Sequence, residues 1–251
     1  MRILLTNDDG IRAAGLRALV EGLSREGHEI LVAAPANERS ASSHAITLGG
    51  HLKIEELSPP PRAEFSVHGT PADCVKFALA EISGFKPDLI ISGINQGANT
   101  GVSVFYSGTI SAAREGTINR IPSAAISLCS KESSDFSVGV EIARRIIEAC
   151  QKGLLSAEVM LNVNIPALPS KAIRGIRVTK QASSRFIEEF IYGKTTGFER
   201  LYTLAGEIEI WDPDGTSDHE AIENDYISIT PLKIDLTEYS SFDTLRQFFS
   251  I

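Results

Sequence analysis

The first half of the chain alternates short apolar runs with amphipathic segments. The run Ile3-Leu4-Leu5 and the apolar segment DLIISGI at residues 88–94 are typical of parallel strands covered on both faces. Between such runs, apolar residues recur at helical spacing, as they do from Leu16 to Leu23, and Gly27 is placed to end that helix. This alternation predicts a parallel sheet with helices on both of its faces.

The expected elements follow from this pattern and from local stop signals. Thr70 is a suitable N-cap, Pro71 fits the first helical turn, and Asp73 complements the helix dipole, so a helix should begin there. The strands are expected at residues 2–6, 28–35, 46–57, 65–68, 88–94, 123–128 and 159–165. The helices are expected at residues 15–23, 70–82, 110–119 and 136–150.

The second half of the chain has a different character. Residues 173–180, 200–204 and 207–211 resemble hairpin strands, and a further strand at 226–232 precedes a terminal helix at 242–249. We therefore expect an α/β core at residues 1–170. Residues 171–251 are expected to form an extension for oligomerisation, consisting of a hairpin, a returning strand and a terminal helix, rather than an independent domain. The predicted assembly is a homodimer or homotetramer.

Composition narrows the class of protein. A chain of 251 residues suits one large α/β domain, and its formal net charge of −8 argues against a nucleic-acid binder, which usually carries a basic stripe. Cys74, Cys129 and Cys150 form no CxxC motif and fit reduced thiols. The sequence has no visible signal peptide and no apolar stretch long enough to span a bilayer, so we expect a cytoplasmic protein without a membrane partner.

The first candidate site is the sequence NDDG at residues 7–10. Asp8 and Asp9 follow a strand directly, and ligands of open α/β sheets bind at the carboxyl ends of strands. Two adjacent carboxylates repel each other unless a cation or strong donors hold them, and a hard divalent cation is the natural partner. The alternative is an ordinary turn, because Asn, Asp and Gly also favour turns and Asp caps helices.

The second candidate is the long Gly- and Asn-rich segment between residues 92 and 116. Asn95 and Asn99 offer amide groups, and Ser107-Gly108-Thr109 stands directly before a predicted helix, whose N-terminus would form an anion site. The alternative is that Ser107 or Thr109 merely caps the helix. Long loops in compact domains are usually functional, which favours a ligand site here.

The loop after the second strand, residues 35–44, is a weaker candidate. Ser40 could ligate a metal or touch a phosphate, and Arg39 could meet an anion or pair with a surface glutamate. The sequence has no GxxxxGK[ST] motif and no GxSxG motif, which excludes a P-loop nucleotidase and an α/β-hydrolase elbow. The five histidines show no metal-ligand spacing and receive no role. A metal beside an anion cradle is what phosphoryl chemistry requires.

At these residues the chain resembles the stationary-phase survival protein E (SurE) family of metal-dependent 5′/3′-nucleotidases. The resemblance spans nearly the whole chain and is most specific where NDDG combines with the SGIN and YSGT segments. The motifs that carry it are ILLTNDDGIRAAGLRAL, NERSASSHAIT, HGTPADCVKFAL, DLIISGINQGANTG, YSGTISAAREG, LNVNIP and DYISITPLKIDLT.

The resemblance implies a Rossmann-like three-layer α/β/α fold with C-terminal elements exchanged between subunits. It also implies one divalent metal ion per subunit, Mg²⁺ or Mn²⁺, with Asp8 and Asp9 as catalytic residues. The implied metal ligands are Asp8, Asp9, Ser40 and Asn95. The implied substrate contacts are Asn95, Asn99, Ser107, Gly108 and Thr109.

The implied reaction is hydrolysis of nucleoside 5′- and 3′-monophosphates to nucleoside and phosphate, with short polyphosphate as a further substrate of some members. The nucleophile could be an activated water or Asp8 itself, through an aspartyl phosphate; we favour water. Two rival hypotheses remain. One is a metal-dependent hydrolase of another ester, although a haloacid-type phosphatase would need Asp-x-Asp. The other is a non-enzymatic nucleotide-binding stress protein.

Overall fold

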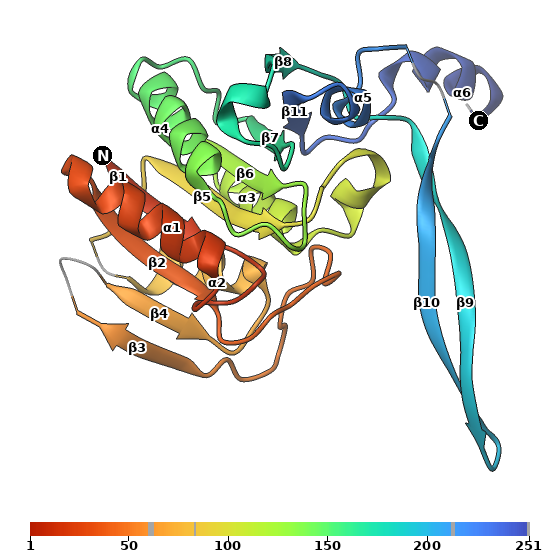
Figure 1. Ribbon diagram of the computed structural model, residues 1–251, viewed down its shortest axis with the longest axis horizontal. Coiled ribbons are helices and arrows are strands. Elements are labelled where there is room, and N and C mark those ends of the chain that lie inside the picture. The colour runs from red at the N-terminus through yellow and green to blue at the C-terminus, as the bar shows by residue number, and fades with distance from the viewer. Residues whose placement is uncertain (60–62, 83, 212–213, 250–251) are drawn as a thin grey trace.

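In the computed structural model, which describes residues 1–59, 63–82, 84–211 and 214–249, nine strands form one sheet and two more form a separate hairpin (Figure 1). The strands are β1 (Arg2–Thr6), β2 (Glu29–Pro35), β3 (Ile54–Ser58), β4 (Glu64–Val67), β5 (Leu89–Gln96), β6 (Ser123–Leu128), β7 (Val159–Ile165), β8 (Gly175–Val178), β9 (Ser184–Thr196), β10 (Glu199–Ile210) and β11 (Tyr226–Lys233). The α-helices are α1 (Ala14–Leu23), α2 (Pro71–Glu81), α3 (Gly108–Ile118), α4 (Ser137–Gln151), α5 (Asp218–Glu223) and α6 (Phe242–Phe249). Short 3₁₀ turns are η1 (Ser24–Glu26), η2 (Gly101–Phe105), η3 (Ser170–Ala172) and η4 (Tyr239–Ser241).

The large sheet is parallel at its centre and mixed at its edges. Its strand order is β3-β4-β2-β1-β5-β6-β7-β11-β8. The strands from β4 to β7 run parallel to one another, whereas β3 is antiparallel to β4 and β11 is antiparallel to β7. Strand β1 pairs with β2 on one side and β5 on the other, so the chain order reverses at β1. In open α/β sheets this reversal marks the ligand crevice, at the carboxyl ends of the strands.

Helices cover both faces of the sheet, as the alternating pattern predicted. Ile3 and Leu5 of β1 belong to a core that packs against α1 and α4. Leu4, between them, points to the other face and packs with Val75 of α2 and Ala112 of α3. All three strand residues are fully buried, which is why this strand is apolar throughout instead of alternating. The predicted three-layer α/β/α fold is confirmed.

The start of α2 is confirmed in detail. Thr70 caps the helix, because its hydroxyl accepts from the Asp73 amide at 3.1 Å and the Asp73 carboxylate accepts from the Thr70 amide at 2.9 Å. The same carboxylate also accepts from the Thr47 amide at 2.9 Å. The predicted strand at 46–57 was therefore wrong in its first part: Thr47 is held by the α2 N-terminus, and only Ile54–Ser58 pairs with β4.

The predictions for the second half needed more correction. Strand β8 is no hairpin strand, because it pairs parallel with β11 in the large sheet. The two predicted strands at 200–211 form the single strand β10, and its partner β9 was missed. Helix α5 was also missed, although Ser217 and Glu220 form a capping box that the sequence displays. Strand β11 and helix α6 lie where they were expected.

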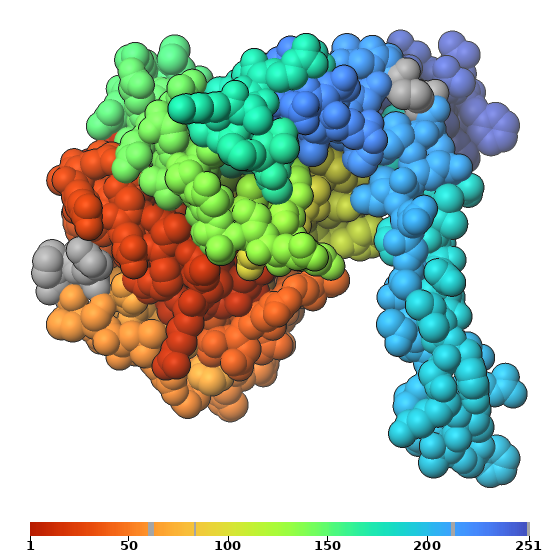
Figure 2. All heavy atoms as spheres, viewed as in Figure 1, coloured from red at the N-terminus to blue at the C-terminus, as the bar shows by residue number. Residues whose placement is uncertain are grey.

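The hairpin of β9 and β10 projects from the rest of the chain as an arm, which is visible in outline in Figure 2. Most of its side chains are exposed, including Phe190 and Leu204. Its root is fixed to the core, where the Ser184 hydroxyl accepts from the Val102 amide at 2.8 Å. The division at residue 170 stays a prediction, and the large sheet itself crosses it through β8 and β11.

We predict that Gly15→Ala destabilises the fold. Helix α1 lies so close to β5 that a Cβ on Gly15 would stand 1.9 Å from the backbone oxygen of Ile94. Backbone atoms cannot rotate away as a side chain can, so the free energy of unfolding should fall by about 1–3 kcal/mol. Urea denaturation measures it, with Gly50→Ala as the control in an exposed loop. Equal stability of the two variants would contradict the close packing.

Candidate active site

The turn after β1 is made by Asn7 and Gly10. The Asn7 side chain is fully buried, donates to the Gly10 carbonyl at 2.8 Å and accepts from the Gly10 amide at 3.2 Å. Gly10 has a φ of +107°, which residues with a side chain rarely adopt. Turn formation therefore accounts for the first and last residues of NDDG. It does not account for Asp8 and Asp9, whose side chains take no part in closing the turn.

Asp8 lies where three segments meet. The Thr109 hydroxyl at the start of α3 donates to its carboxylate at 2.5 Å, and its backbone oxygen accepts from the Arg39 amide at 2.8 Å. A Cβ on Gly108 would stand 2.7 Å from the Asp8 Cβ, so only glycine fits at that position. Burial raises the pKa of Asp8 above its usual value, although hydrogen bonds from Thr109 oppose the increase.

Asp9 is less buried than Asp8, but its pKa is also raised. Burial and the charge of Asp8 together raise the pKa of Asp9 to about 6, although a hydrogen bond from the Gln96 backbone opposes the increase. The carboxylate of Glu38 also raises both pKa values. Among the described groups that shift these two pKa values, no side chain is cationic. A divalent cation with oxygen ligands would relieve this repulsion.

The start of α3 lies beside Asp8, and Ser107 and Thr109 have different roles there. The Ser107 hydroxyl accepts from the Ile110 amide at 3.1 Å, so Ser107 caps the helix as the alternative hypothesis held. Thr109 does not cap, because its hydroxyl is directed to Asp8. Helix N-termini attract anions through their free amides and dipole. An anion at this end of α3 would therefore lie beside the carboxylate pair.

Asn95 and Asn99 occupy different environments. The Asn95 side-chain nitrogen donates to the Gly97 carbonyl at 2.8 Å, which turns its amide oxygen away from Gly97. Asn99 is 7% exposed, and its side-chain nitrogen donates to the Ser127 hydroxyl at 2.9 Å. The predicted phosphate contact of Asn99 stays a prediction, and the structure gives its side chain a partner within the protein.

Two further asparagines hold this segment, and sequence reasoning gave them no role. The side chains of Asn162 and Asn164 both donate to the Asn99 carbonyl, at 2.8 and 3.2 Å, and the Asn99 amide donates to the Asn164 side-chain oxygen at 2.8 Å. Both asparagines are fully buried on β7. Their spacing of two residues in the otherwise apolar motif LNVNIP placed them on one face, which was the available signal.

The loop between β2 and β3 brings Ser40 toward this edge of the sheet. The Arg39 amide donates to the Asp8 carbonyl at 2.8 Å, so the residue before Ser40 in the chain is bound to the backbone of Asp8. Ser40 is exposed, and its hydroxyl donates to Glu38 at 2.5 Å. Glu38 was missed by the sequence analysis, because a glutamate in a polar loop is typical of any protein surface.

Comparison with known proteins identifies the family of the chain. A family model described as Survival protein SurE matches residues 3–188, which include every candidate site residue. The chain belongs to the SurE family. Proteins named 5′-nucleotidase SurE are 43% identical in Syntrophobacter fumaroxidans, over 99% of both chains, and 44% identical in Symbiobacterium thermophilum, over 98% of this chain and 97% of the relative.

A solved structure extends the similarity to the fold. The crystal structure of the SurE protein from Aquifex aeolicus superimposes with a TM-score of 0.84 at 34% sequence identity and covers 99% of each chain. The similarity therefore includes the part of this SurE chain that lies beyond residue 188. The family resemblance inferred from NDDG and the SGIN and YSGT segments is confirmed.

We predict that Asp9→Asn stabilises this SurE protein when metal is removed with a chelator. The pKa of Asp9 is raised from 3.8 to about 6, so its ionisation opposes folding. This penalty is absent below about pH 4, grows as the pH rises to about 6 and is complete above it. Asn cannot ionise, so the variant should gain stability over wild type at pH 7.5 but not at pH 4. Urea denaturation at both pH values measures this, and an equal difference at both would contradict it.

Proposed function

We propose that this chain is a divalent-metal-dependent phosphatase that hydrolyses nucleoside 5′-monophosphates to nucleoside and phosphate. The observation that carries the proposal is the hydrogen bond between Asp8 and Thr109, which joins a repelling carboxylate pair to a helix N-terminus. Relatives named 5′-nucleotidase at 43–44% identity support the substrate class. We extend the proposal to nucleoside 3′-monophosphates and to a cytoplasmic location.

None of the described helices is long and apolar enough to cross a membrane.

The side chains at this edge of the sheet fit a hard divalent ion. The proposed ligands are the carboxylates of Asp8 and Asp9, the Ser40 hydroxyl and the Asn95 amide oxygen, an all-oxygen set of the kind that Mg²⁺ and Mn²⁺ accept. The described residues contain no group of three or more His, Cys, Asp or Glu side chains that could hold a metal ion, so Ser40 and Asn95 would have to complete this set. When bound, one such ion per subunit would supply Lewis acidity toward a phosphate oxygen.

Groups of the protein itself would stabilise the phosphate, orient Asp8 and accept a proton. The first amides of α3 and the dipole of that helix stabilise negative charge on the phosphate. Thr109 holds Asp8 in one orientation through its hydroxyl. Asp8 is the group proposed to accept a proton from an attacking water. Gly108 keeps the helix close enough for both groups to face the same phosphate, since a side chain there would displace Asp8.

Turnover of adenosine 5′-monophosphate by Asp8→Asn and Asp9→Asn tests this proposal. Each variant should lose at least about 100-fold in kcat, because it removes a charge on which the reacting centre depends. A chelator should abolish the activity of wild type. Asp88→Asn is the matched control, since Asp88 precedes β5 at the opposite end of the strands and pairs with Arg2. Full activity in either site variant, or binding of the nucleotide without turnover by wild type, would refute the proposal.

We also propose that the arm joins two or more copies of the chain. A two-stranded hairpin is marginally stable in water unless another surface covers it. Phe190 on the arm and Phe248 on α6 are 65% and 81% exposed, which is costly for a monomer. A second copy related by a two-fold axis would cover both surfaces in a closed dimer, and pairs of dimers would form a tetramer.

Shortening the arm should reduce the oligomeric state. Ile187 and Glu207 are paired across the hairpin, so residues 188–206 can be replaced by Asn-Gly without disturbing its root. Light scattering should give at least a dimer for wild type at micromolar concentration and a smaller species for the shortened variant. The melting temperature should change little if the core folds by itself. A monomeric wild type with full activity would contradict this proposal.

A further inference from the structure

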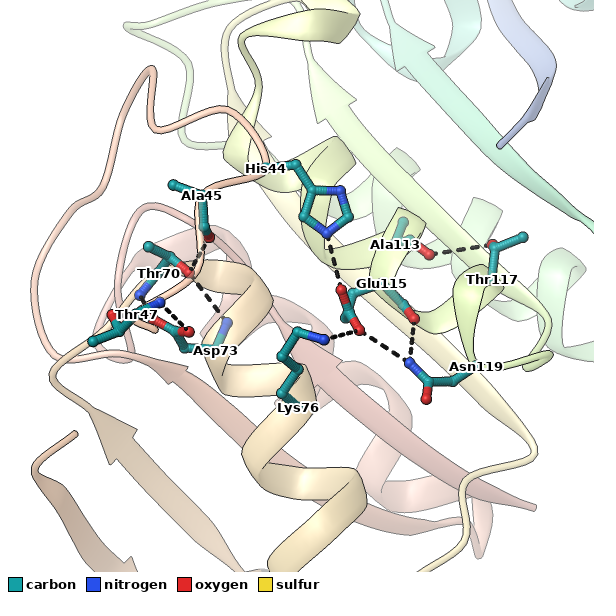
Figure 3. Close-up of polar contacts among 10 residues, drawn as sticks. All are labelled: His44, Ala45, Thr47, Thr70, Asp73, Lys76, Ala113, Glu115, Thr117 and Asn119. Carbon is teal, nitrogen blue, oxygen red and sulfur yellow. Dashed lines mark hydrogen bonds and ion pairs between the residues drawn. The ribbon is translucent and has the colours of Figure 1, made fainter. Parts of the chain in front are cut away.

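A buried carboxylate on α3 binds the loop that carries Ser40. Glu115 is 2% exposed, and its two oxygens contact side chains from two other segments (Figure 3). Lys76 of α2 donates to one oxygen at 2.8 Å, and His44 lies 2.9 Å from the other through its Nε2. Asn119, the C-cap of α3, also donates to the carboxylate at 3.1 Å. We call His44, Lys76 and Glu115 the latch.

The latch has a charged centre. Burial raises the pKa of Glu115, but the hydrogen bonds from His44 and Lys76 outweigh burial and hold that pKa below its usual value. A buried carboxylate that remains charged depends on each of its partners, because removing one leaves charge that water cannot reach. One cation, Lys76, already balances the charge of Glu115. The contact with His44 is therefore not needed for charge balance.

The loop that bears His44 is strained. Ala41 and Ser43 have φ values of +53° and +52°, in the left-handed region that non-glycine residues rarely adopt. Such conformations are energetically costly and persist only where surrounding contacts hold them. Several contacts do so here: Arg39 donates to the Asp8 backbone, Ser43 to the Tyr106 backbone, and the Thr70 hydroxyl to the Ala45 carbonyl. His44 lies in the middle of this set.

One helix joins the latch to the candidate active site. Thr109 and Glu115 both belong to α3, and six residues of helix span about 9 Å. Thr109 binds Asp8 at the start of this helix, while Glu115 binds His44 further along it. The Ser40 loop is thus fixed to Asp8 at Arg39 and to α3 at His44, and Ser40 lies between these two points in the chain.

We propose that His44 is a positioning residue, whose contact with Glu115 holds the strained loop so that Ser40 stays beside Asp8 and Asp9. The role of Ser40 as a metal ligand rests on the proposed function. The holding of the loop stands on the contacts themselves. His44 does not act on substrate in this account, because its Nε2 is engaged by Glu115.

The test compares His44→Ala with His44→Gln, whose amide nitrogen can still donate to Glu115. Amide hydrogen exchange at residues 39–45 reports whether the loop is held. Calorimetric titration with Mn²⁺ alone reports whether the metal ligands are in place. Arg17→Ala is the matched control, because Arg17 forms a half-buried ion pair with Glu64 at 2.7 Å, away from the latch.

His44→Ala should accelerate exchange at residues 39–45 and weaken Mn²⁺ binding by about tenfold or more, the usual effect of losing an outer partner of a metal site. His44→Gln should restore both values to within about twofold of wild type, and Arg17→Ala should change neither. Unchanged exchange in His44→Ala would overturn the proposal, as would faster exchange with unchanged Mn²⁺ affinity.

The two proposals fail separately in these experiments. If wild type binds Mn²⁺ but does not hydrolyse nucleotides, the proposed function fails and both readouts of the latch still apply. If wild type binds no Mn²⁺, the proposed ligand set fails and hydrogen exchange alone decides whether His44 holds the loop. Equal exchange in His44→Ala and Arg17→Ala would then reject the latch.

Discussion

Two carboxylates forced together at the edge of the sheet are the constraint to which the rest of the site responds. Asp8 and Asp9 are neighbours in the chain just after β1, where burial raises both pKa values and the charge of Asp8 raises the pKa of Asp9 further. A protein gains nothing in stability from such a pair. We therefore propose that the pair serves ligand binding, and Thr109, Gly108 and the α3 N-terminus lie beside the same carboxylates.

Neutral side chains, rather than charged ones, fix the backbone around Asp8 and Asp9. Asn7 closes the turn that presents the carboxylates, and Asn162 and Asn164 fix the segment that leads from β5 to α3. These neutral amides satisfy backbone groups without adding charge to a region that already has too much of it. The loop after β2 is instead contacted by a buried charge, that of Glu115, which Lys76 balances and His44 contacts.

The sequence predicted structural features that neighbouring residues determine, and it missed contacts between residues far apart in the chain. The N-cap Thr70 and the buried strand β1 were correct, because local spacing and apolar runs determine them. Strand β9 was missed because it carries apolar residues such as Phe186 and Ile187 on both faces, so it shows no alternation. The NDDG and YSGT segments identified the family, but the contact between His44 and Glu115 spans 71 residues and leaves no local pattern.

The most direct measurement of the central claim is a crystal structure with Mn²⁺ and a phosphate analogue, with the metal located by its anomalous scattering. The account predicts one Mn²⁺ peak per chain between the carboxylates of Asp8 and Asp9, with the anion against the backbone amides at Gly108 and Thr109. A metal peak elsewhere on the chain, or an anion bound away from the start of α3, would contradict it.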